Sequence, residues 1–125
     1  MKVALITGAI ALLLSLHLSF LATTPWPTLV YIGPFAFLLL VGHFTRSTEH
    51  TLRYAAIGGL IPIAAFHAYF LYDIWVRLPT EGGGANIGLG LIYLALPFIS
   101  GACMMAGRSV AAGQTVSNSA AGWWD

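Results

Sequence analysis

Four long apolar stretches, separated by short polar segments, dominate the pattern of hydrophobic and polar positions along the 125-residue chain. A helix needs about 20 mostly apolar residues to cross the hydrocarbon core of a bilayer. Each stretch is long enough, and the predicted spans are about residues 3–22, 26–45, 52–76 and 85–107. The pattern therefore predicts an all-α integral membrane protein, a four-helix bundle that forms one domain over residues 1–107.

The composition changes after the fourth stretch. Residues 108–125 are rich in Ala, Gly, Ser, Gln and Asn and end with Trp123, Trp124 and Asp125. Such a segment has little apolar surface to bury, so we expect a flexible C-terminal tail. Its two tryptophans, Trp123 and Trp124, are suited to the headgroup region or to a groove on another subunit.

The few charged residues mark the ends of the spans. Only 7% of the residues are charged and 58% are hydrophobic, which is far from the composition of soluble domains. Four basic residues fall on one side of the predicted topology, namely Lys2, Arg46, Arg53 and Arg108. On the other side Arg77 lies four residues after Asp73, where the two can pair on one helix face. The positive-inside rule then predicts that both termini are cytoplasmic, in a bacterial-type inner membrane.

Charge balance also bears on partners. The formal net charge is +1, which does not suggest binding to nucleic acid. No charged residue falls near the predicted bilayer centre, so the sequence contains no obvious charged transport site. The expected partners are the lipid bilayer and other membrane subunits, or a second copy of the chain.

Aromatic side chains gather toward the boundary opposite the basic residues. Because tryptophan and tyrosine are enriched at membrane interfaces, we interpret five of them as an aromatic belt: Trp26, Tyr31, Tyr69, Tyr72 and Trp75.

Small residues recur at the four-residue spacing that lets membrane helices pack closely. Gly8 and Ser15 belong to such a series in the first span, Gly59 in the third and Gly101 in the fourth. They indicate packing within the bundle or contact with a partner, and both alternatives remain open.

Prolines interrupt the second, third and fourth spans at Pro34, Pro62 and Pro97. Each removes a backbone donor and frees the carbonyl four residues earlier, which for Pro62 is that of Gly58. A freed carbonyl at membrane depth needs a donor, which a hydroxyl, water or a ligand can supply. The prolines thus predict either simple kinks or a site.

Among the four histidines, His17 and His67 are the candidates for a site. His17 lies about 14 residues into the first span and His67 about 14 residues beyond Arg53, so each lies about 21 Å from the same boundary. Two histidines at one depth could ligate a b-type haem, bind a metal as a pair or form a proton relay. The alternative is that each bonds a neighbouring carbonyl. His43 and His50 fit interfacial positions.

No sequence motif assigns an enzymatic activity or a structural metal site. The chain has no phosphate loop, dinucleotide fingerprint, zinc spacing or nucleophile elbow. We therefore expect a non-catalytic accessory or structural subunit of a larger, energy-converting membrane complex, such as one in electron transport. Two alternatives stay open: a haem- or quinone-associated anchor that uses His17 and His67, and a small oligomeric channel or transporter.

Overall fold

The structure is a computed structural model that describes residues 2–45, 47–81 and 87–121. Within these residues it is helical apart from short turns, and it contains four helical segments long and apolar enough to cross a membrane. The prediction of an all-α, four-helix membrane protein is confirmed. The side on which the termini lie stays a prediction, and Trp123 and Trp124 lie outside the described residues.

The first two helices match the predicted spans closely: α1 covers Lys2–Ala22 and α2 covers Trp26–Phe44. The third rod is longer than predicted, because α3 (Glu49–Tyr72) continues through a π-helical turn, η1 (Asp73–Arg77), into the short α4 (Leu78–Glu81). Thr48 caps the start of α3, where its side-chain oxygen accepts a hydrogen bond from the backbone N–H of Thr51.

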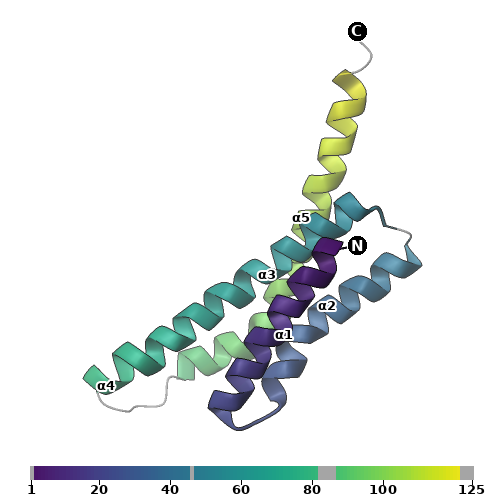
Figure 1. Ribbon diagram of the computed structural model, residues 1–125. Coiled ribbons are helices and arrows are strands. Elements are labelled where there is room, and N and C mark those ends of the chain that lie inside the picture. The colour runs from purple at the N-terminus through teal and green to yellow at the C-terminus, as the bar shows by residue number, and fades with distance from the viewer. Residues whose placement is uncertain (1, 46, 82–86, 122–125) are drawn as a thin grey trace.

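The last helix differs from the prediction at its C-terminal end. We expected it to end near Gly107, but α5 covers Ile87–Ala121 and extends beyond the bundle (Figure 1). Alanine, serine and glutamine permit helix where nothing interrupts the backbone ladder, so the change in composition did not mark a helix end. The assignment of residues 108–125 as a flexible tail stays a prediction.

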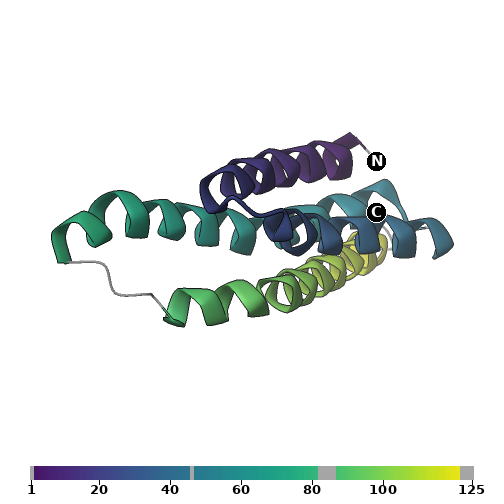
Figure 2. The same cartoon turned by 90° about the horizontal axis from the view of Figure 1, so that it is seen from below.

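The helices form layers in which α1 and α5 lie on opposite sides of α2 and α3 (Figure 2). In the described residues α1 contacts α2 and α3 but not α5, whereas α3 contacts every other long helix. The closest neighbours are α3 and α5, which run antiparallel. The helix order, which the sequence left undetermined, places α3 at the centre of the molecule.

Glycines bring the backbones of α3 and α5 into direct contact. A Cβ atom built on Gly58 would lie 2.5 Å from the carbonyl oxygen of Cys103, and one on Gly107 would overlap the carbonyl of Tyr54. A Cβ atom on Gly59 would instead overlap the side chain of Met104. Close backbone approach at small residues is the usual means of association in lipid, where the hydrophobic effect adds nothing between helices. Gly58 and Gly59 thus act in packing within the chain.

A hydroxyl bridges the same two helices near the proline of α3. Ser100 of α5 is fully buried and donates a hydrogen bond of 2.9 Å to the carbonyl of Gly59. This acceptor adjoins the Gly58 carbonyl, which the sequence identified as freed by Pro62. The bond satisfies the buried Ser100 hydroxyl within the bundle, through a carbonyl next to the freed one.

The remaining small residues divide into two groups. Ser15 is fully buried and its hydroxyl donates 2.7 Å to the carbonyl of Leu12, so it faces the interior of the bundle. In contrast, a Cβ on Gly8, Gly33 or Gly101 would meet no atom within 4 Å. These three glycines are not required for packing inside the described chain.

We expect Gly58→Leu and Gly107→Leu each to lower the free energy of unfolding by about 1–3 kcal/mol, because the added side chain forces α3 and α5 apart. Gly8→Leu is the matched control and should leave stability nearly unchanged, since its side chain enters open space. Thermal unfolding in one detergent checks this. Equal losses for Gly58→Leu and Gly8→Leu would contradict the packing described.

Candidate functional site

His17 and His67 meet at the contact between α1 and α3. Nδ1 of His17 lies 3.1 Å from Nε2 of His67, within hydrogen-bonding distance, and the two ring centroids are 5.3 Å apart. His67 is only 5% exposed, whereas His17 lies on the outside of α1. The shared depth expected from the sequence is thus accompanied by direct contact. Their role as cofactor ligands stays a prediction.

A tyrosine from a third helix completes the cluster. The hydroxyl of Tyr31 on α2 lies 3.4 Å from Nδ1 of His67, on the opposite side of the ring from His17. Tyr31 is fully buried, so its assignment to an aromatic belt is wrong. Trp26, Tyr69, Tyr72 and Trp75 are exposed, as belt residues should be. His17, His67 and Tyr31 therefore form one polar cluster that joins α1, α3 and α2.

Local helix geometry explains how Tyr31 enters the bundle. The buried positions of α2 recur every three or four residues, so they share one face, and they are Pro27, Tyr31, Pro34, Phe35, Leu38 and Gly42. This spacing is the signal that could have identified Tyr31. It was hidden because the opposite face of α2 is also apolar, as lipid exposure requires.

The cluster does not fit a haem ligated by both histidines. Two ring nitrogens that bind a metal from opposite sides, each at about 2 Å, lie about 4 Å apart, whereas the nearest nitrogens of His17 and His67 are 3.1 Å apart. No macrocycle fits between rings in such contact. Nδ1 of His67 is also engaged, by Tyr31. The arrangement offers no support for the haem alternative.

The other metal-binding side chains do not extend the cluster. Within the described residues no three His, Cys, Asp or Glu side chains gather where they could hold a metal ion. His43 and His50 are exposed near the helix ends, beside the rings of Phe44 and Tyr54 respectively. Both positions agree with the interfacial assignment made from the sequence.

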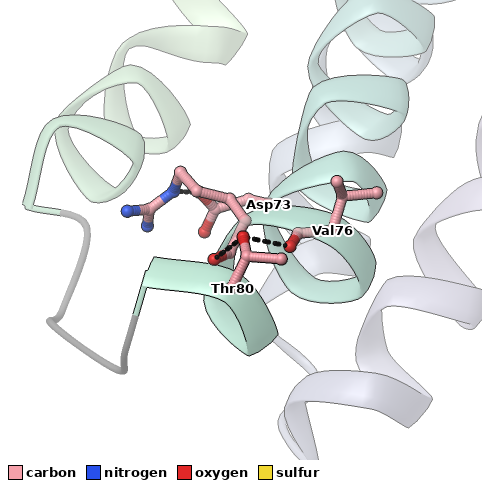
Figure 3. Close-up of polar contacts among 4 residues, drawn as sticks. Asp73, Val76 and Thr80 are labelled. Atoms are coloured by element: carbon pink, nitrogen blue, oxygen red, sulfur yellow. Dashed lines mark hydrogen bonds and ion pairs between the residues drawn. The ribbon is translucent and has the colours of Figure 1, made fainter.

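Asp73 and Arg77 form the predicted ion pair at the π-helical turn. Nε of Arg77 contacts Oδ1 of Asp73, and the Asp73 side chain is buried. Thr80, near the end of the rod, donates its hydroxyl to the carbonyls of Val76 and Arg77, at 2.8 and 3.0 Å (Figure 3). The ion pair with Arg77 neutralises the charge of Asp73 near the end of the third span, where an unpaired charge in lipid would be costly.

A long groove runs between α2 and α5 on the surface of the bundle. Its volume is about 720 Å³, and its lining extends from Trp26 at one end to Arg108 at the other. Gly33 and Pro34 of α2 face Pro97 and Gly101 of α5 within it. Apart from Arg108 the lining is almost wholly apolar. Pro97 and Gly101, which the sequence marked for packing or partner contact, therefore belong to an open surface.

A second cavity, of about 630 Å³, lies at the end of the bundle near Trp26. Its walls are aromatic and aliphatic and include Phe66, Phe70 and Tyr93. The hydroxyl of Tyr93 is buried and has no hydrogen-bond partner among the described residues. No sequence pattern singles out Tyr93, since it is one tyrosine within an apolar span.

Comparison of the chain with protein-family models, with curated proteins and with solved structures finds no match. The chemistry of the cluster and the shape of the groove therefore carry the functional interpretation.

We expect the contact between His17 and His67 to contribute a coupling free energy of about 0.6–2 kcal/mol, the range of hydrogen bonds between membrane helices. A double-mutant cycle with His17→Phe, His67→Phe and the double variant measures it from unfolding free energies. The same cycle on His43 and His67, which belong to different regions, is the control and should give no coupling. Strict additivity for the first pair would show that the two rings do not interact.

Proposed function

We propose that the protein is a non-catalytic accessory subunit of a larger membrane complex, and that it holds a transmembrane helix of a partner in the groove between α2 and α5. One observation carries the proposal: Gly33 and Gly101 line this groove from facing helices, and neither is used in packing inside the chain. Glycine on an open face lets a partner backbone approach closely.

The length of the groove favours a helix over a lipid chain. From Leu94 to Arg108 the lining residues of α5 cover 14 helical steps, or about 21 Å at 1.5 Å per residue. One leaflet contributes only about half of the roughly 30 Å hydrocarbon core. An acyl chain would fill part of the groove, whereas a membrane-spanning helix would follow it from Trp26 to Arg108.

The lining chemistry favours binding over transport. Both described cavities are bounded almost entirely by apolar side chains. A permeating ion needs carbonyls, charges or hydroxyls to replace its hydration shell. Neither surface supplies such a series of groups, so the channel alternative has little support from these cavities.

The proposal extends to the kind of complex and its location. We assign the subunit to an energy-converting complex of a bacterial-type inner membrane, such as one in electron transport. The four candidate spans, with charged residues confined to their end regions, support a role within the bilayer.

We expect a photo-cross-linking side chain at Phe98, which lines the groove and is 79% exposed, to give one discrete cross-linked product in native membranes. Gly33→Leu and Gly101→Leu should remove that product, because the added side chains fill the groove. The matched control is Gly8→Leu, which adds the same side chain on α1 and should retain it.

A cross-linker at Ile61 of α3, which is 63% exposed and lines neither described cavity, reports non-specific capture. Equal product from Phe98 and Ile61, or a product that survives both glycine substitutions, would contradict the groove as the docking surface.

A further inference from the structure

The buried hydroxyl of Tyr31 fixes the direction of the hydrogen bonds in the polar cluster. Tyr31 is 0% exposed, so neither water nor a headgroup can accept its proton. Among the described residues its hydroxyl contacts only Nδ1 of His67. A buried donor without an acceptor costs about 1–3 kcal/mol. The favoured arrangement therefore has the Tyr31 hydroxyl donating to Nδ1 of His67.

That first bond determines the tautomers of both histidines. A neutral imidazole carries one donor and one acceptor nitrogen. Because Nδ1 of His67 accepts from Tyr31, its Nε2 carries the proton and donates to Nδ1 of His17, 3.1 Å away. His17 must then carry its own proton on Nε2. The hydrogen bonds run in one direction, from α2 through α3 to α1.

The last donor in this series has no partner in the described chain. His17 is exposed on α1, and its Nε2 makes no hydrogen bond to a described residue. His17 lies five residues, or about 7.5 Å, before the end of α1 at Ala22 and about 22 Å from its other end, inside the predicted hydrocarbon span, where lipid supplies no acceptor. A polar group left unsatisfied in lipid is costly, so this N–H marks a place where something else must bind.

We propose that His17 is the contact point for a transmembrane helix of a different subunit, which presents a hydrogen-bond acceptor to Nε2 at the same depth. The proposal rests on the proposed function in taking the partner to be a membrane helix. It adds a second docking face, on α1, and the chemistry of the partner: a side-chain amide, carboxyl or free carbonyl within an apolar helix.

The shape of this face favours a helix over a small ligand. The side chains on the same stripe of α1 as His17 are exposed and recur at helical spacing, at Ile10, Leu13 and Phe20. They form an apolar ridge with one polar group. Neither described cavity includes His17 in its lining. A single polar position in an apolar helix contact is a recognised way to specify register and partner.

A second copy of the chain docked through the same stripe does not satisfy the cluster. Tyr31 imposes the same tautomers in each copy, so two His17 side chains would present N–H groups to each other. Two donors cannot form a hydrogen bond. The chemistry therefore excludes a symmetric contact through His17 and favours a partner that places an acceptor there.

The tautomers can be measured on the full chain in lipid nanodiscs, with histidine labelled in ¹⁵N at a pH where the rings are neutral. We expect His17 and His67 both to carry the proton on Nε2. In Tyr31→Phe the hydroxyl that donates to Nδ1 of His67 is lost, so His67 should show a mixture of both tautomers. The spectrum of His17→Phe shows which signals belong to His17. A proton found on Nδ1 of His67 in the unmodified chain would overturn the proposal.

The docking step is tested with a defined probe, a monomeric polyleucine transmembrane peptide that carries one Asn at the depth of His17. In vesicles, energy transfer between the peptide and the labelled full chain should show association about 3- to 30-fold tighter than for the all-leucine peptide. His17→Phe should abolish that preference. A peptide with Asn at the opposite depth is the matched control and should behave like all-leucine.

Three results distinguish docking on the α1 face at His17 from docking in the groove between α2 and α5. If Gly33→Leu with Gly101→Leu leaves the Asn preference intact, the α1 face acts on its own, as proposed. If these substitutions remove it, the peptide binds in the groove and the α1 face is excluded. If a lipid-soluble quinone shifts the His17 signal and the Asn peptide does not, the occupant is a small carbonyl ligand, and the helix proposal is wrong.

Discussion

The fold depends on the absence of water from the hydrocarbon core, which requires every polar group there to find its partner in protein. The central helix α3 receives these contacts. His67 bonds the side chains of His17 and Tyr31, and the carbonyl of Gly59 accepts from Ser100, so α3 has a polar link to each of the other three long helices. Since dispersion alone distinguishes poorly between apolar surfaces, these few directional bonds define how the helices are paired.

The glycines of the chain serve two purposes that their spacing does not distinguish. Gly58 and Gly107 admit the backbone of the opposite helix, which fixes α5 against one side of α3. Gly33 and Gly101 line a surface that nothing in the described chain covers. Glycines thus pack α5 against α3, and other glycines line the uncovered groove between α2 and α5. Such a groove is suited to binding a further helix.

The sequence predicted the spans well and the packing poorly, for one physical reason. In lipid, apolar side chains are favourable on both faces of a helix. Length and composition therefore located α1 and α2 within about a residue, but no periodic stripe of apolar residues showed which face is buried. Counting helix steps from a common boundary brought His17 and His67 to one depth. It could not reveal Tyr31, whose helix runs the opposite way and whose inward direction depends on packing. The helix after Gly107 was missed because weak helix formers continue a helix already nucleated.

The extension of α5 continues the last predicted span as helix well beyond Arg108. From Arg108 to Ala121 the helix advances 13 helical steps, or about 20 Å along its axis. The headgroup layer on each side is only about 5–8 Å thick. Figure 1 shows that this part of α5 continues beyond the other helices. If α5 leaves the bilayer steeply, its last turn lies past the lipid phosphates, in water. The end of α5 at Ala121 would then stand clear of the headgroup layer by about the length of two helical turns.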